Sequence, residues 1–203
     1  MFITLEGIEG SGKSTLASAL AEALRAAGHA VVSVREPGGT PVGDAVRGIF
    51  LQPGLRIDPV GELFLINASR QALVRQVIRP ALESGKVVIC DRYVDSTRAY
   101  QGYGRGLKMA DIDAACDLAT EGLDPSITFL LDIDLALSYE RLLSRGNSHD
   151  RMEQEDIQFH ARVRDGFLAL AEHHSSRIRR LDASEPVEAL LERVVMHIAG
   201  ARR

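Results

Sequence analysis

The sequence GIEGSGKS, residues 7–14, matches the pattern G-x-x-x-x-G-K-[ST] at every fixed position. A short apolar run, Phe2 to Leu5, precedes it, and apolar residues at helical spacing follow it as far as Gly28. This context predicts a strand, a glycine-rich loop and a helix. In that arrangement the backbone N–H groups of the loop and the amino-terminal end of the helix bind a polyphosphate. The stretch therefore predicts a nucleotide site.

Two side chains of the loop have expected roles in that site. Lys13 would reach the β and γ phosphates of a nucleotide, and the Ser14 hydroxyl would be a ligand of Mg²⁺. We predict the nucleotide-binding residues to be Gly7, Ile8, Glu9, Gly10, Ser11, Gly12, Lys13, Ser14 and Thr15. A glycine turn that binds nothing is the alternative, but such a match arises by chance in only roughly 1% of chains of this length. The loop does not indicate which reaction follows, because motors, switches and kinases share it.

Length and composition predict one globular domain, residues 1–203. The chain has 203 residues, of which 45% are hydrophobic, and a formal net charge of −4. This charge argues against a large basic face for nucleic acid. The two cysteines, Cys90 and Cys116, suit neither a disulfide framework nor a zinc site, and both are expected in the core. No signal peptide or apolar run of about twenty residues is found, so we expect a cytoplasmic protein without membrane contacts.

Strand and helix patterns alternate along the rest of the chain. Further strands are predicted at residues 30–34, 87–90, 127–131 and 178–183, and helices at 42–50, 59–84, 112–119, 135–143, 159–171 and 187–198. Pro80 should kink or break the long helix. Five strands alternating with helices predict a three-layer α/β fold with a parallel sheet. His160, His173 and His174 are expected to face solvent.

Polar residues follow two of the predicted strands at the end where open α/β sheets bind ligands. Asp91 follows the unbroken apolar run 87–90, and a carboxylate there is suited to hold the Mg²⁺ shell, usually through water. An ion pair with a neighbouring arginine is the alternative. The turn at residues 35–40 lies at the end of an adjoining strand. Residues 95–106 read as a mobile surface loop, yet their hydroxyl, amide and aromatic side chains suit a nucleoside pocket.

A short charged segment, residues 145–151, separates two predicted helices. Such segments are usually just solvated. The alternative is a closing lid whose arginines meet the transferring phosphoryl group, a contact that contributes ~10³-fold or more in rate.

Taken together, the motifs closely resemble those of the thymidylate kinase family, in its bacterial type. They are Gly7 to Ser14, Glu36-Pro37-Gly38-Gly39-Thr40, Asp91-Arg92-Tyr93, Ala99-Tyr100-Gln101-Gly102 and Arg145 to Arg151. The resemblance covers nearly the whole chain in order, and the motifs after the glycine loop are the more particular ones. It implies the P-loop nucleoside monophosphate kinase fold with a lid at about residues 144–155. It also implies transfer of the γ-phosphoryl group of ATP to dTMP with Mg²⁺, and a homodimer.

The resemblance also assigns site residues. The implied dTMP-binding residues are Glu9, Glu36, Pro37, Arg47, Ile66, Arg70, Arg92, Ser96, Thr97, Tyr100 and Gln101. Within this set, Arg47 and Arg92 would hold the acceptor phosphate, and Tyr100 would crowd a 2′-hydroxyl. Ser14 and Asp91 would serve the metal. The implied catalytic residues are Lys13, Arg92, Arg145 and Arg151, the last two because no variable position of the glycine loop is basic.

One position departs from the family pattern. Ile66 stands where a phenylalanine usually stacks on thymine, four residues before Arg70, and Phe64 is on another side of the helix. Base selectivity is therefore the open point, with dUMP as the competitor, because one methyl group discriminates by only roughly 10–200-fold.

Two other functions stay open. A kinase for another nucleoside monophosphate or for a deoxynucleoside would share the loop and the Asp-Arg pair. A non-enzymatic nucleotide switch is the other class. Residues 58–61 do read D-x-x-G, but they open a predicted helix, and no N-K-x-D motif occurs.

Overall fold

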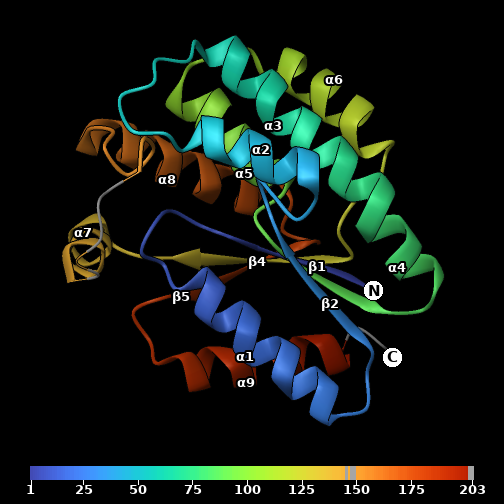
Figure 1. The fold of residues 1–203 in the computed structure, drawn as a ribbon. Helices are drawn as coiled ribbons and strands as arrows, with labels where there is room; N and C mark the ends of the chain where they lie inside the picture. The colour runs from blue at the N-terminus through green and yellow to red at the C-terminus, as the bar shows by residue number, and fades with distance from the viewer. Residues whose placement is uncertain (145, 147–149, 201–203) are drawn as a thin grey trace.

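A computed structural model of the protein describes residues 1–144, 146 and 150–200. Its centre is a parallel sheet of five strands in the order β2-β3-β1-β4-β5 (Figure 1). The strands are β1 (Phe2–Glu6), β2 (Val31–Arg35), β3 (Val87–Asp91), β4 (Ile127–Asp132) and β5 (Ile178–Asp182). The predicted five-stranded parallel sheet is confirmed.

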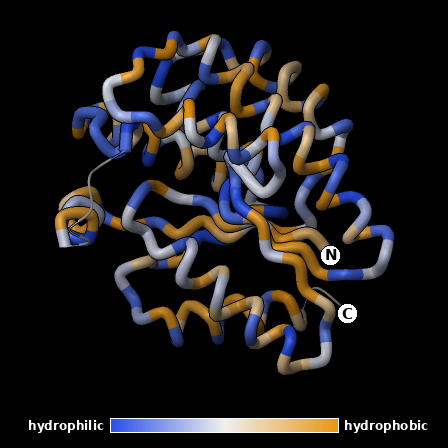
Figure 2. The backbone as a smooth tube through the Cα atoms, in the orientation of Figure 1, coloured by the Kyte–Doolittle hydropathy of each residue, from blue (hydrophilic) through white to orange (hydrophobic). Residues whose placement is uncertain are grey.

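Helices cover both faces of the sheet. They are α1 (Lys13–Ala26), α2 (Pro41–Phe50), α3 (Pro59–Leu73), α4 (Arg79–Glu83), α5 (Val94–Thr97), α6 (Met109–Thr120), α7 (Leu135–Ser144), α8 (Ile157–His173) and α9 (Val187–Gly200). Helices α1 and α9 lie on one side, and α3, α4 and α6 lie on the other (Figure 1). The hydrophobic strands run between these layers (Figure 2). This is the three-layer arrangement that the sequence predicts.

Burial along each strand explains the strand order. All residues of β1 and β4 are buried, and so are the apolar residues 87–90 of β3. Unbroken apolar runs of this kind belong in the middle of a parallel sheet that helices cover on both faces. In β5 only Ile178 and Leu181 are buried, and its arginines are not, which suits the edge strand. The carboxyl ends of β1, β2 and β3 therefore meet at one rim of the sheet.

The predicted long helix at 59–84 is interrupted. Helix α3 ends at Leu73, a π-helical turn η1 follows (Val74–Ile78), and α4 begins at Arg79. Pro80 lies in the first turn of α4, where its missing N–H costs no hydrogen bond. The wider π turn just before it spares the clash that a proline ring makes with the carbonyl four residues earlier. The interruption thus precedes the proline.

The prediction of a surface loop at residues 95–106 is wrong. Helix α5 and a second π-helical segment, η2 (Arg98–Gly104), occupy most of it, and Tyr100 and Gln101 are buried. Its glycines allow close helix packing. A Cβ atom on Gly104 would lie 2.7 Å from Phe159 Cε2, and one on Gly166 of α8 would lie 2.6 Å from Tyr103 Cγ. Glycines that resemble loop residues in the sequence here let η2 pack directly on α8.

The remaining observations concern the cysteines, the start of α7 and the length of the helices. Cys90 and Cys116 are buried free thiols, as expected. The helix at α7 is capped by Asp134, whose Oδ1 accepts from Ala136 N at 2.9 Å. In the part of the chain that is described, no helix is long and apolar enough to cross a membrane.

Candidate active site

A cavity of about 220 Å³ opens at the rim where β1, β2 and β3 end. The glycine loop forms one wall, α2 and α3 form another, and α5 and η2 close the far side. Of the predicted site residues, it is lined by Glu9, Gly10, Gly12, Lys13, Ser14, Thr15, Glu36, Pro37, Arg47, Ile66, Arg70, Asp91, Arg92, Ser96, Thr97, Tyr100 and Gln101. Gly7, Ile8 and Ser11 shape the loop behind this lining. Residues assigned to two different substrates thus share one cavity.

Backbone geometry makes the glycines of the loop necessary. Gly7 has φ +141° and Gly10 has φ +71°, values that favour glycine. A Cβ atom would lie 2.5 Å from Leu131 O at Gly7 and 2.7 Å from Ser138 O at Gly10. The loop is therefore packed against β4 and α7. It leads into α1, whose first N–H groups have no side-chain cap. Such an end binds anions.

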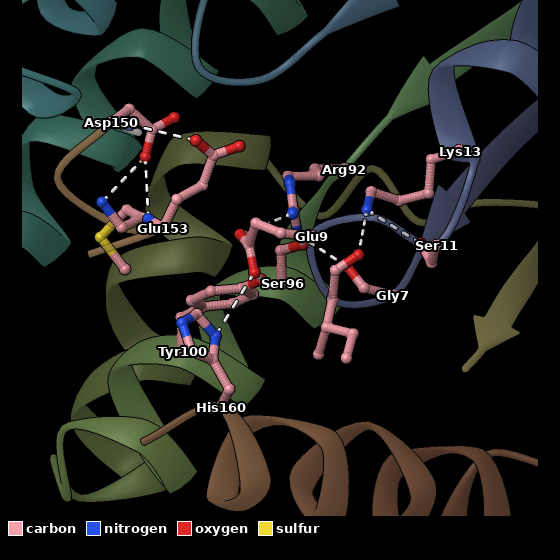
Figure 3. Close-up of polar contacts among 12 residues, drawn as sticks. Gly7, Glu9, Ser11, Lys13, Arg92, Ser96, Tyr100, Asp150, Glu153 and His160 are labelled. Atoms are coloured by element: carbon pink, nitrogen blue, oxygen red, sulfur yellow. Dashed lines mark hydrogen bonds and ion pairs between the residues drawn. The ribbon is translucent and has the colours of Figure 1, made fainter. Parts of the chain in front are cut away.

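Lys13 extends across the inside of this loop (Figure 3). Its Nζ donates to Ile8 O at 2.7 Å and to Ser11 Oγ at 3.2 Å. Burial and the nearby Arg92 lower the pKa of Lys13 to about 8. A phosphate beside Nζ would favour the charged ammonium. The loop thus holds its lysine in a position that suits a polyphosphate.

Ser14 and Asp91 form the candidate metal position. The Ser14 hydroxyl donates to Asp91 Oδ2 at 2.6 Å, so the first turn of α1 is tied to the end of β3. Both offer the hard oxygen ligands that Mg²⁺ prefers. Among the described residues, no group of three His, Cys, Asp or Glu side chains could hold a metal ion. The two residues fit an ion that the phosphates of a nucleotide also bind.

Arg92 lines the cavity and has an unusual backbone conformation. It has φ +72°, a left-handed value that is rare outside glycine and that typically costs about 1–3 kcal/mol. Its guanidinium donates to Gly7 O at 3.0 Å, Ser96 Oγ at 3.2 Å and Glu9 Oε1 at 3.0 Å. It also lies 5.0 Å from the centre of the Tyr100 ring. Strain at a position with so many contacts is typical of functional sites.

Glu9 is bound on several sides. Its carboxylate accepts from Tyr100 Oη at 2.6 and 2.7 Å and pairs with Arg92 (Figure 3). Burial raises the pKa of Glu9, but Arg92 and Lys13 lower it more, so it stays below the usual value. His160 Nδ1 lies 3.6 Å from Glu9 Oε2, with the side chain 16% exposed. The prediction that His160 faces solvent is therefore wrong, because α8 packs against η2 and turns this ring inward.

Arg70 fixes one end of the cavity. It is 1% exposed and donates to Glu36 Oε2 at 2.9 and 2.6 Å and to Thr97 Oγ1 at 3.0 Å. Ile66 lies one turn before it and lines the cavity. Phe64 is 65% exposed, so it does not replace a ring at position 66, as the helical spacing predicts.

Two further arginines line the end of the cavity near Arg92. Arg47 donates to Pro37 O at 3.0 Å and lines the cavity together with Arg35. Burial and the neighbouring Arg35 lower the pKa of Arg47. With Arg92, three cationic groups surround this end, an arrangement that suits an anion. Arg35 was not among the predicted site residues, although its place at the end of β2 could have indicated it.

Glu6 is another residue that sequence reasoning missed. It is buried at the end of β1 and accepts from Ser96 Oγ at 2.5 Å and from Tyr93 N at 2.8 Å. Burial and the nearby Asp95 raise the pKa of Glu6 to about 8. Since Ser96 also accepts from Arg92, Glu6 helps to orient that arginine. A charged residue at the end of an apolar strand, directly before the glycine loop, is the pattern that could have revealed it.

The two predicted lid arginines have different outcomes. Arg145 lies outside the described residues. Arg151 is 8% exposed and does not line the cavity, because it donates to Phe50 O at 2.8 Å and to Glu62 Oε1 at 2.6 Å. Its neighbours Asp150, Met152 and Glu153 line the cavity instead, and none of them was predicted. The catalytic role of both arginines stays a prediction.

A glycine loop with its lysine, an acidic strand end and an arginine cluster face one cavity in a parallel α/β sheet. Together they define a P-loop kinase that acts on small phosphorylated acceptors. A family model described as thymidylate kinase matches residues 5–194. The chain therefore belongs to the thymidylate kinase family, as its motifs indicate, and is an ATP-dependent nucleoside monophosphate kinase.

Comparison with individual proteins supports the same family. The chain is 53% identical to the thymidylate kinase of Deinococcus radiodurans, over 94% of this chain and 92% of that protein. It is 48% identical to that of Gloeobacter violaceus, over 96% and 92%. The crystal structure of thymidylate kinase from Ehrlichia chaffeensis matches it with a TM-score of 0.79 at 36% identity, and covers 98% of each chain.

Proposed function

We propose that this protein transfers the γ-phosphoryl group of ATP to dTMP, giving dTDP and ADP, a step toward dTTP. One observation carries the proposal: a single cavity is lined both by the glycine loop and by Arg70, Thr97 and Tyr100. A donor and an acceptor nucleotide would therefore meet there. Phosphoryl transfer needs mainly such positioning and the neutralisation of charge.

Different residues bind the two substrates. On the donor side, Lys13 and the amino terminus of α1 bind the phosphates of ATP. Ser14 and Asp91 would hold Mg²⁺, which when bound neutralises the charge of the phosphate oxygens. On the acceptor side, Arg47 and Arg92 hold the phosphate of dTMP. Tyr100, fixed by Glu9, lies against the sugar, where it disfavours a 2′-hydroxyl.

The transition state still needs a cation from the lid. We assign this role to Arg145 and Arg151, in a lid at residues 144–155 of a single kinase domain, 1–203. Arg151 would have to leave Glu62 and Phe50 to reach the phosphates, so a lid movement is part of the proposal. Closure would also exclude the water that hydrolyses ATP.

A coupled assay of ADP release tests the function. It compares dTMP, dUMP, AMP, CMP, GMP and thymidine at fixed ATP and Mg²⁺. We expect dTMP to give the highest kcat/KM. A higher value with another acceptor would favour the kinase alternative, and nucleotide binding without transfer to any acceptor would favour a switch. Residues 58–61 open α3 and do not follow a strand, which argues against the switch.

Replacing Ile66 by phenylalanine should improve acceptor binding. An aromatic ring stacked on the base gains about 0.5–1.5 kcal/mol, so KM for dTMP is expected to fall about 2- to 10-fold with little change in kcat. KM for dUMP should fall in parallel. Leu118→Phe, at an 81% exposed position on α6, is the control. An unchanged KM for dTMP in a folded Ile66→Phe variant would count against base binding at this position.

We also propose a homodimer formed through α3. Val60 and Phe64 are 49% and 65% exposed and lie one helical turn apart, so they present an apolar face. Phe64→Glu is expected to convert the dimer to a monomer in light scattering after size exclusion. Ile157→Glu, at an equally exposed position on α8, should leave the dimer intact. A Phe64→Glu protein that remains dimeric would exclude this interface.

A cytoplasmic location is likewise proposed. It is supported by the free thiols of Cys90 and Cys116 and by a substrate pair that the cytoplasm supplies.

A further inference from the structure

The carboxylate of Glu62, on α3, is completely buried yet lies outside the cavity lining. It accepts four hydrogen bonds. Oε2 accepts from Gln101 Nε2 at 2.9 Å and from Arg105 Nε at 3.1 Å. Oε1 accepts from Arg105 Nη2 at 2.8 Å and from Arg151 Nη1 at 2.6 Å. One buried group thus connects α3, η2 and the segment that precedes α8.

This arrangement determines which way the Gln101 amide points. A carboxylate can only accept, so Gln101 must turn its nitrogen toward Glu62. Its other atom, Oε1, is buried and has no hydrogen-bond partner among the described residues. Gln101 lines the cavity, and so does Ile66, one turn after Glu62 on α3. An unpartnered acceptor therefore belongs to a residue of the cavity lining, close to the position that the resemblance assigns to the base.

We propose that Glu62 is a positioning residue that fixes the polarity of the Gln101 amide and thereby selects the base of the acceptor nucleotide. The inference rests on the proposed function. An acceptor oxygen fits the N3–H group of thymine or uracil. It opposes cytosine, whose N3 is itself an acceptor. A buried polar group that the wrong ligand leaves unpaired discriminates strongly.

Arg105 and Arg151 make Glu62→Gln an informative substitution. While Arg151 is bound to Glu62, before any lid movement, two guanidinium donors meet at Oε1 and only one, Arg105 Nε, meets Oε2. The carbonyl oxygen of the new amide is therefore favoured at Oε1. The NH₂ group of the new amide would then face Gln101 in place of Oε2. Gln101 would have to flip, and would present its own NH₂ group to the cavity. A change of one atom at position 62 would thus reverse the hydrogen-bonding character of the base end.

The experiment measures kcat/KM for dTMP and for dCMP at saturating ATP and Mg²⁺. In Glu62→Gln we expect the ratio of dTMP to dCMP to fall at least about tenfold, through KM more than through kcat, the scale of one buried hydrogen bond. Gln101→Ala should lower the ratio similarly. Adding Glu62→Gln to Gln101→Ala should lower it no further, because both act through one amide.

Arg105→Ala is the matched control, since it removes two of the four hydrogen bonds of Glu62 but leaves the Gln101 contact. We expect it to lower the melting temperature and to keep the ratio.

An unchanged ratio in folded Glu62→Gln would overturn the proposal. So would an unchanged ratio in Gln101→Ala, which decides the matter should Glu62→Gln not fold. A ratio that falls equally in Arg105→Ala would also overturn it, in favour of a structural role. A wild-type protein without transfer to dTMP would instead refute the proposed function.

Discussion

Replacing Lys13 by alanine is expected to lower kcat for ADP formation with dTMP by about 10²- to 10³-fold, the effect of removing one preorganised charge from a phosphoryl-transfer site. The ammonium faces the inside of the glycine loop, where its partners are Ile8 O and Ser11 Oγ. No other lysine lines the cavity formed by the described residues, so none can replace it.

Stability should hardly change in this variant. The substitution removes a buried charge whose pKa is already lowered by burial, and it leaves the carbonyl of Ile8 next to the cavity, where water can reach it. Thermal unfolding checks this point, and Lys86→Ala, at an exposed position, is the control for loss of a lysine. A folded Lys13→Ala protein with near-normal kcat would remove the lysine from the mechanism.

Replacing Arg92 by alanine is expected to lower kcat/KM for dTMP by about 10³-fold or more, because its guanidinium holds the acceptor phosphate in line with the transferring group. The variant loses the hydrogen bonds to Gly7 O, Ser96 and Glu9, and it leaves a buried carboxylate without its main cation. Because Ser96 and Glu9 belong to the proposed acceptor site, KM for dTMP should rise while KM for ATP changes little.

Arg92→Lys separates charge from geometry at position 92, and Arg75→Ala is the control. Arg92→Lys keeps the charge but loses the fork that contacts three partners at once, so we expect only partial recovery. Arg75→Ala, at an arginine whose side chain is 64% exposed, should leave kinetics unchanged. Equal effects of Arg92→Ala on KM for ATP and for dTMP would contradict the assignment to the acceptor.

Local patterns predict much of this fold and site. The order of strands, loops and helices can be read from short apolar and polar runs. This order places the glycine loop, its lysine and Asp91 at one rim of a parallel sheet. Residues whose hydrogen-bond partners are far away in the sequence cannot be predicted in this way. Glu62 meets Gln101 and Arg151 from 39 and 89 residues away, so its function cannot be read from its own helix.

The roles of two glycines and one histidine could not be predicted for the same reason. Gly102 and Gly104 are typical loop residues in the sequence, but in the structure they allow η2 to pack closely on α6 and α8. Whether a glycine marks a turn or close packing depends on what lies opposite, which a single sequence does not state. His160 is likewise turned toward Glu9 only because α8 packs on η2.

Because α8 packs on η2, a substitution outside the acceptor pocket can change the shape of that pocket. Gly166 lies on α8, outside the cavity lining, but a methyl group there would collide with the ring of Tyr103, and η2 would have to move away from α8. Tyr100, on the same segment, would shift relative to Glu9. Sequence variants that alter sugar discrimination can therefore arise at a helix-packing position that no nucleotide touches.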